Sequence, residues 1–245
     1  MASVTRDDMT TIQGRITAFW NAVAGDYDAD PGNVAAPGTP AYAAWAQAIR
    51  SVLPNAPSDV LDLGTGTGYV ASIVAELGHR VTGLDLSEKM LAVARAKALD
   101  ARLEVSFETG DAVAPPLPAA SFDVVIARSL IWTLRELQTA FCAWHALLRS
   151  GGRVVVIYSL SSDEAHDDDA AAPSEDGRRD FFMRYYTTET QAALPGIKLR
   201  DHQPLLRASQ LAGFVDASVT PLETVRRCDT ASAPDEPYAL VARRT

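Results

Sequence analysis

Three closely spaced glycines follow a short apolar run in the segment VLDLGTGTGYVA, residues 60–71. Gly64, Gly66 and Gly68 lack the Cβ atoms that would hinder a tight turn or the approach of a ligand to the backbone. Asp62 stands two residues before the first of them, and its carboxylate repels a phosphate but attracts a cationic amino or sulfonium group. The segment therefore predicts a loop that holds a ligand with a cationic, amino-acid-like part.

A dinucleotide-binding loop has a similar glycine pattern, G-x-G-x-x-G/A, and is the main alternative for this segment. Counted from Gly64, that fingerprint requires a small residue at position 69, where this chain has Tyr69. Together with Asp62, the mismatch disfavours NAD(P) as the ligand. An NAD(P)-dependent oxidoreductase stays open as the weaker alternative.

Two further acidic residues follow the next expected strands. Asp85 ends an expected strand about 20 residues after Gly64, where a carboxylate can accept hydrogen bonds from both hydroxyls of a ribose. Asp111 follows the next strand in the triplet Gly-Asp-Ala, and its carboxylate can accept a hydrogen bond from the amino group of an adenine. Glycine loop and acids together indicate a nucleoside with a cationic tail.

Such residues meet only if parallel strands end at one edge of a sheet. From residue 58 to 156, short β-branched runs alternate with helical runs, which is typical of βαβ units. We expect strands at 59–63, 80–85, 103–107, 122–127 and 153–158. We expect helices at 69–77, 88–99 and 134–148, with Ser87 as the N-cap of the second and Gly151 ending the third.

The flanking regions predict further elements around this core. We expect helices at 11–24, 42–53 and around 204–212, and strands at 217–222 and 238–243. The polar stretch 161–177 has almost no large apolar residue and is expected to be a solvated or mobile loop. We interpret the chain as one domain, 1–245, comprising an N-terminal helical cap (1–55), a cofactor-binding core (56–158), a substrate lid with a helix (159–213) and C-terminal strands (214–245).

Residues 60–158 resemble the class I S-adenosylmethionine-dependent methyltransferases, in particular their small-molecule branch of natural-product and quinone enzymes. The matching segments are VLDLGTGTG, GLDLSEKML, GDA, FDVVIARSLIWTL and LLRSGGRVVVI, with FWNAVAGDYD ahead of them. The resemblance implies an α/β, Rossmann-like, doubly wound and mostly parallel seven-stranded sheet that ends in an antiparallel hairpin. It also implies S-adenosylmethionine as cofactor and S-adenosylhomocysteine as product.

The resemblance also implies a role for individual residues. The glycine loop would hold the methionine part, Asp85 the ribose, and Asp111 with its neighbour the edge of the adenine, while a tyrosine at the position of Tyr27 closes over the cofactor. The cofactor-binding candidates are Tyr27, Asp62, Gly64, Thr65, Gly66, Gly68, Asp85, Leu86, Met90, Asp111, Ala112 and Arg128. Met90 has an alternative role as a core residue of its helix.

The acceptor is expected to be a small, hydrophobic or aromatic molecule. A net charge of −9 opposes binding to a nucleic-acid backbone, and Arg128–Ile131 stands where amino-methylating nucleic-acid enzymes carry a [D/N]-P-P-[Y/F] tetrapeptide. Four aromatic residues with helical spacing form either a lid over the substrate or a core-facing helix, and we favour the lid. The substrate candidates are Trp132, Phe181, Phe182, Tyr185 and Tyr186.

The sequence offers only weak candidates for a general base and none for a metal. His166 and His202 lie in the region expected to overhang the substrate, whereas His79 precedes a strand and so lies at the opposite edge, and His145 is expected to pack. The acids at 167–169 stand side by side in a polar loop, so we predict no metal ion.

Cysteine usage and the opening residues bear on location and partners. The two cysteines form no C-x-x-C pair, which fits a reducing cytosol, and the opening residues carry acids rather than a basic and then apolar signal. We therefore expect a cytoplasmic protein that binds no membrane, with a homodimer left open. The expected function is SN2 transfer of a methyl group to an O, N or C nucleophile, the alternative being a cofactor-binding protein of the same fold without transferase activity.

Overall fold

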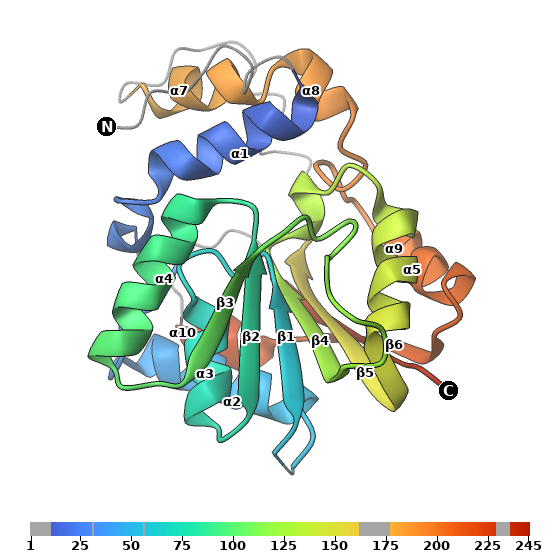
Figure 1. Cartoon of the computed structure of the whole chain (residues 1–245). Helices are drawn as coiled ribbons and strands as arrows, with labels where there is room; N and C mark the ends of the chain where they lie inside the picture. Colours follow the sequence, from blue (N-terminus) through green and yellow to red (C-terminus); the bar gives the residue numbers. More distant parts are fainter. Residues whose placement is uncertain (1–10, 31, 56, 162–176, 229–235) are drawn as a thin grey trace.

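A computed structural model describes residues 11–30, 32–55, 57–161, 177–228 and 236–245 of the chain. A seven-stranded sheet with the order β3-β2-β1-β4-β5-β7-β6 forms its centre (Figure 1). The strands are β1 Asp59–Leu63, β2 Arg80–Asp85, β3 Val105–Thr109, β4 Phe122–Arg128, β5 Leu148–Ser159, β6 Val215–Pro221 and β7 Pro237–Arg243. The first five are parallel, and β7 is antiparallel to both β5 and β6, which confirms the expected sheet.

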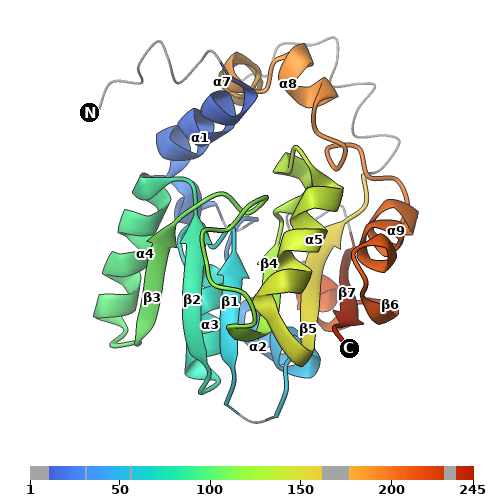
Figure 2. The ribbon, with the colours of Figure 1, turned by 45° about the vertical axis from the view of Figure 1, so that its right-hand side comes forward.

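Both faces of the sheet are covered by helices, because the central strands are apolar on both sides. The helices are α2 Pro40–Val52, α3 Tyr69–Glu76, α4 Glu88–Asp100, α5 Leu137–Leu147, α9 Gln203–Leu211 and α10 Glu223–Cys228. Figure 2 shows α5 and α9 on one face of the sheet and α2 and α3 on the other. Leu61 and Leu63 pack with α5 and α9, while Val60 packs with α2, α3 and α10. Helix α4 packs on β2 and β3.

A second group of helices lies above the carboxyl ends of the strands, and we call it the roof. It consists of α1 Ile12–Val23, α7 Arg178–Tyr185 and α8 Thr188–Ala192 (Figures 1 and 2). Arg15 joins α1 to α8: its Nε donates to the hydroxyl of Thr190 at 2.9 Å, and its Nη2 contacts the carboxylate of Glu189 at 2.8 Å. Residues distant in sequence thus form one cover over the sheet edge.

The N-terminal region differs from the single cap expected for residues 1–55. Helix α1 belongs to the roof, but α2 packs on the face of the sheet, where Trp45 and Ile49 are buried. The apolar side of α2 is therefore buried against this face of the sheet. A short 3₁₀ turn, η2 Tyr27–Ala29, lies between the two helices.

Several element boundaries also differ from the expectation, among them the start of β5, which is Leu148 rather than residue 153. Strand β3 begins at Val105 rather than at residue 103, and α5 begins at residue 137 because a 3₁₀ turn, η3 Ile131–Thr133, precedes it. Gly151 does not end α5: it lies within β5 with φ of +79°. Phe122 pairs with Leu148 whereas Val124 pairs with Arg153, so the register of β4 against β5 shifts here. Gly151 lies in this irregular part of β5. Ser87 caps α4 as predicted, accepting a hydrogen bond from the Met90 N–H at 3.1 Å.

Candidate functional site

A pocket lies at the carboxyl ends of β1, β2, β3 and β4, and residues of α1 from the roof also line it. The strand order reverses between β1 and β4, which is where open α/β sheets bind their ligands. The space between the lining atoms amounts to about 980 Å³, including solvent at the mouth. Of the twelve cofactor-binding candidates, eleven line it: Tyr27, Asp62, Gly64, Thr65, Gly66, Asp85, Leu86, Met90, Asp111, Ala112 and Arg128.

The glycine loop after β1 adopts a conformation that other residues strongly disfavour. Gly64, Gly66 and Gly68 have φ values of +64°, +55° and +79°. A Cβ on Gly66 would meet no atom closer than 4.0 Å, so the space beside it belongs to the pocket. A Cβ on Gly68 would instead lie 3.0 Å from the Cβ of Ala94. Gly68, the twelfth candidate, therefore lets α3 and α4 approach each other and lies outside the lining of the pocket.

Asp62 at the end of β1 is a fully buried acid beneath this loop. Its Oδ2 accepts a hydrogen bond from the Thr65 hydroxyl at 2.6 Å, and its side chain also accepts one from the Ala71 N–H. Burial raises the pKa of Asp62 to about 7, with the nearby Asp85 adding to the rise and Arg128 opposing it. A cation that enters beside Asp62 lowers this pKa and favours the ionised form.

The raised pKa of Asp62 predicts that stability falls as the pH rises. The pKa is about 7 in the folded protein against an ordinary value of 3.8, so between these values the native state holds a proton that the unfolded chain has lost. Raising the pH through this window therefore destabilises the native state, by about 2–3 kcal/mol between pH 5 and 8. Urea unfolding at the two pH values should show this loss, and Asp62→Asn should reduce it; an unchanged pH dependence in the variant would contradict the assignment.

Asp85 at the end of β2 fastens the glycine loop to its own strand. One carboxylate oxygen accepts the Gly66 N–H at 2.9 Å and the other accepts the Ser87 N–H at 2.8 Å. Burial nevertheless raises the pKa of Asp85. Each oxygen keeps a second lone pair, so the carboxylate can bind a pair of hydroxyls from a ligand while it holds the loop.

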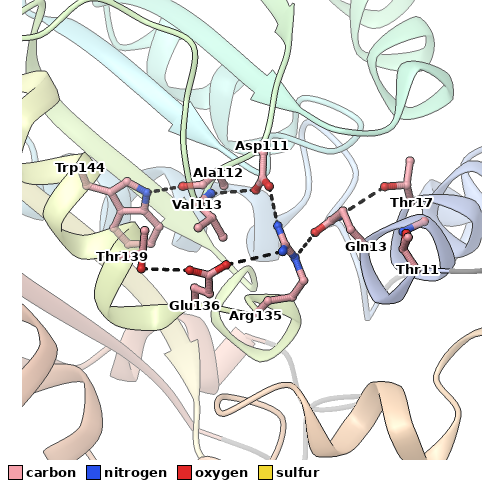
Figure 3. A network of polar contacts seen from close by, with 11 residues as sticks. Thr11, Gln13, Thr17, Asp111, Ala112, Val113, Arg135, Glu136, Thr139 and Trp144 are labelled. Atoms are coloured by element: carbon pink, nitrogen blue, oxygen red, sulfur yellow. Dashed lines mark hydrogen bonds and ion pairs between the residues drawn. The ribbon is translucent and has the colours of Figure 1, made fainter.

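Asp111 after β3 is part of a polar network that crosses the pocket (Figure 3). Its Oδ1 accepts the Val113 N–H at 2.9 Å, and its Oδ2 lies 2.6 Å from Nη2 of Arg135. Arg135 also donates from Nε to Gln13 of α1 at 2.5 Å. The guanidinium of Arg135 thus connects the sheet edge to the roof. Asp111, Arg135 and Gln13 all line the pocket.

Arg128 brings positive charge to the end of β4. Its guanidinium lies over the rings of Trp45 and Tyr69, 4.4 and 5.1 Å from their centroids, and its Nη2 donates to the Asn33 carbonyl at 3.0 Å. The residue is thereby positioned against the N-terminal segment, on the same pocket as Asp62. It can neutralise a carboxylate on a bound ligand.

Tyr27 is held over the glycine loop through its neighbour. Asp28 accepts a hydrogen bond from the Thr67 hydroxyl at 2.6 Å and pairs with Lys97 of α4 at 2.5 Å. Burial raises the pKa of Tyr27, which keeps its phenol neutral. Tyr27 thus forms a neutral wall of the pocket.

The five substrate candidates lie above the pocket and are not among its lining residues. Tyr186 stacks on Phe182 at 4.5 Å between centroids, and Phe19 of α1 contacts the rings of Phe181, Phe182, Tyr185 and Tyr186. The Trp132 ring lies 5.3 Å from that of Tyr186 and 5.6 Å from that of Trp20, which does line the pocket. These residues form the aromatic cluster of the roof.

The histidines are distributed away from the pocket, within the described part of the chain. His202 lies at the start of α9, where its Nδ1 is 2.7 Å from the Tyr158 hydroxyl, and His166 is outside the described residues. His145 packs edge-on against Phe214 at 4.9 Å, and His79 accepts the Ser58 N–H at the opposite edge of the sheet. The geometry therefore brings no described histidine to the pocket.

The described residues offer neither a cluster of metal ligands nor a helix that could span a membrane. They contain no group of three or more His, Cys, Asp or Glu side chains that could hold a metal ion, and residues 167–169 lie outside them. The same residues include no helix with the length and apolar character needed to cross a membrane. The absence of a metal stays a prediction.

Several lining residues were missed by reasoning from the sequence. They are Gln13, Ile16, Thr17 and Trp20 of α1, with Val34, Thr67, Tyr69, Val70, Ser87, Gly110, Val113, Ser129, Leu130, Thr133, Leu134 and Arg135. Those of α1 share one side of an amphipathic helix, but the periodicity gives no indication of what that side faces. Ser129 has a φ of +54°, which is unusual for a residue other than glycine and marks the sharp turn after β4.

Comparison with known proteins identifies a family for the core. A family described as a methyltransferase domain matches residues 61–156. The demethylmenaquinone methyltransferase of Thermus thermophilus is 38% identical over 113 residues, which is 45% of this chain and 51% of that protein. A ubiquinone biosynthesis O-methyltransferase of Pseudomonas aeruginosa is 34% identical over 97 residues, 39% of this chain and 41% of that protein. The chain thus spans about half the length of the curated relatives it matches.

A solved structure extends the likeness to the whole fold. A Haemonchus contortus phosphoethanolamine N-methyltransferase in complex with phosphomonomethylethanolamine and S-adenosylhomocysteine matches 100% of this chain and 61% of its own. The TM-score is 0.59 and the sequence identity 20%, so this likeness concerns the fold.

Proposed function

From the premise that the chain belongs to the class I S-adenosylmethionine-dependent methyltransferases, we propose that it transfers a methyl group from S-adenosylmethionine to a small aromatic acceptor. One observation carries the proposal. The carboxylates of Asp62, Asp85 and Asp111, each just after or at the end of a strand, converge on the pocket that the glycine loop borders.

The chemistry of these side chains fits the cofactor. S-adenosylmethionine carries a sulfonium, an ammonium, a carboxylate, a ribose and an adenine. Asp62 and Asp85 suit the cationic tail and the ribose hydroxyls, and Arg128 suits the carboxylate. The open space beside Gly66 leaves room for a ligand against the backbone. Leu86 and Met90 provide apolar surface for the adenine.

When bound, the cofactor supplies a methyl group on a positively charged sulfur, which a nucleophile displaces in line. The residues of this chain hold and orient the two reactants. Such positioning can lower the barrier by up to about 7–11 kcal/mol, so the reaction does not require a histidine at the pocket. Trp20 and Tyr27 cover part of the pocket with aromatic surface, which displaces water from that part when the reactants bind.

The roof supports an aromatic acceptor. Four of the five substrate candidates belong to its aromatic cluster, Phe181 joins them through Phe19 and Tyr185, and the cluster reaches the pocket through Trp20. Relatives named as menaquinone and ubiquinone methyltransferases give the same indication. We therefore propose a hydroxylated ring of the quinol type as acceptor. The proposal includes a cytoplasmic location and a homodimer, and it leaves open which atom of the acceptor is methylated.

Truncation of the aromatic cluster should weaken acceptor use without affecting the cofactor. Phe182→Ala removes a ring that stacks on Tyr186 and contacts Phe19, so the roof loses its support above Trp20. We expect the acceptor KM to rise about fivefold, while the Kd for S-adenosylhomocysteine changes less than twofold. Steady-state kinetics and calorimetry measure the two. Met183→Ala, on the exposed side of the same helix, is the matched control; equal effects of both variants would contradict the proposal.

Two measurements test the function itself. Calorimetry should detect binding of S-adenosylhomocysteine and no comparable binding of NAD; the reverse result would favour the oxidoreductase. Radiolabelled S-adenosylmethionine should then transfer its methyl group to a prenylated naphthohydroquinone. Binding of S-adenosylhomocysteine without transfer to any hydroxylated aromatic compound would favour a cofactor-binding protein without transferase activity.

A further inference from the structure

A chain of hydrogen bonds leads from the roof into the pocket through three side chains. The indole N–H of Trp20 in α1 bonds to the hydroxyl of Tyr186, which follows α7. The Tyr186 hydroxyl lies 2.8 Å from that of Thr133 in η3. Trp20 and Thr133 line the pocket, whereas Tyr186 has no exposed surface. The bonds thus run from one wall of the pocket to another through a buried phenol.

The types of the groups determine the direction of these bonds. An indole N–H only donates, so the Tyr186 oxygen is the acceptor from Trp20. Tyr186 has one proton of its own, and leaving a buried hydroxyl proton without an acceptor destabilises the fold. Its neighbour at 2.8 Å is the Thr133 oxygen, so Tyr186 donates to Thr133. The Thr133 hydroxyl therefore accepts in this bond and keeps its own proton for another partner.

We propose that Thr133 is a specificity-determining residue that donates this proton to a ring oxygen of the methyl acceptor. The inference rests on the proposed function and deepens it. The oxygen would be a carbonyl, enolate or phenolate, held beside Trp20. A hydroxyl donor suits a neutral or delocalised oxygen better than it suits a carboxylate. A ligand carboxylate would need a cation, and Arg135 on the same pocket is already paired with Asp111.

The rigidity of the surroundings makes Thr133 an oriented donor. The Thr133 N–H donates to the Leu130 carbonyl at 3.1 Å, which fixes the backbone of η3. The rings of Trp132 and Tyr186 lie 5.3 Å apart beside it. The direction of the hydroxyl is thus set by Tyr186 and does not have to be acquired when the acceptor binds.

The test compares two bicyclic probes that differ in one oxygen. 1-Tetralone has a carbonyl that only accepts hydrogen bonds, and tetralin is the same ring system without it. With S-adenosylhomocysteine bound, calorimetry should show that wild-type protein prefers 1-tetralone about tenfold. Thr133→Val should reduce the preference to less than twofold, and Tyr186→Phe to about threefold. Thr133→Ser and Tyr185→Phe, which keep the donor, should leave it unchanged.

Each contrary result has a defined meaning. Equal binding of the two probes to the wild type, binding of neither at millimolar concentration, or a preference retained in Thr133→Val would overturn the role of Thr133. Methyl transfer to a quinol without any preference between the probes would overturn this inference alone. A clear preference without methyl transfer to any aromatic compound would instead overturn the proposed function. If Thr133→Val does not fold, the comparison of Tyr186→Phe with Tyr185→Phe decides.

Discussion

Replacing Gly66 with valine is expected to abolish the binding of S-adenosylhomocysteine. The φ of Gly66 is +55°, and a β-branched residue there strains the backbone by about 1–3 kcal/mol. The Cβ would meet no protein atom within contact distance, so the two methyl groups would project into ligand space. The Gly66 N–H also bonds to Asp85, and a displaced loop loses that bond. Calorimetry should show no binding at about a hundred times the wild-type Kd.

The control variant Gly78→Val distinguishes the effect of backbone strain from the effect of side-chain atoms in the ligand space. Gly78 has a φ of +88° with open space around it, but it lies between α3 and β2, at the opposite edge of the sheet from the pocket. This variant should lose a similar amount of stability and bind S-adenosylhomocysteine normally. Normal binding by Gly66→Val would show that the glycine loop is only a turn.

Replacing Asp85 with alanine should weaken the binding of S-adenosylhomocysteine about a hundredfold or more. A hydrogen bond to a charged acceptor contributes about 1.5–3 kcal/mol, and two ribose hydroxyls are expected to lose theirs. The fold should persist, because burial raises the pKa of Asp85, so removal of the buried charge offsets the loss of its bonds to Gly66 and Ser87. Calorimetry and thermal unfolding of the same preparation measure both quantities.

Two variants show whether the effect is specific. Asp85→Asn retains the size of the side chain but offers one acceptor oxygen instead of two, so its affinity should lie between those of wild type and Asp85→Ala. Asp100→Ala removes an exposed acid at the end of α4 and should change nothing. An unaltered Kd in Asp85→Ala would exclude Asp85 from the ribose site.

Much of the cofactor side of the pocket can be predicted from sequence, because local patterns specify it. Strands β1 and β2 have the expected bounds, and the acids follow the strand ends directly. Once the parallel βαβ pattern is recognised, Asp62, Asp85 and Asp111 must meet at one edge. The glycines add a backbone conformation that few other residues adopt. Each of these inferences depends on a short stretch of chain.

The acceptor side depends on contacts between distant segments and could not be predicted in the same way. Trp20 and Thr133 are separated by more than 100 residues, and nothing in either local pattern indicates that Tyr186 joins them. Helix α5 begins at Leu137 rather than at the expected residue 134 for a related reason. Leu134 is buried in the core, and the chain turns through η3 before the helix begins. Tertiary packing overrides helical propensity there.

The division between sheet edge and roof has a consequence for how such a protein diversifies. The residues proposed to hold the cofactor come mainly from the strand ends, whereas the aromatic cluster comes chiefly from α1 and α7, joined to one another by contacts such as that of Phe19 with Tyr186. Substitutions that reshape the cluster therefore leave the glycine loop and its acids intact. Descendants of one ancestor can acquire new acceptors by exchanging these two segments together, whereas exchange of either alone would separate partners that have to vary as a pair.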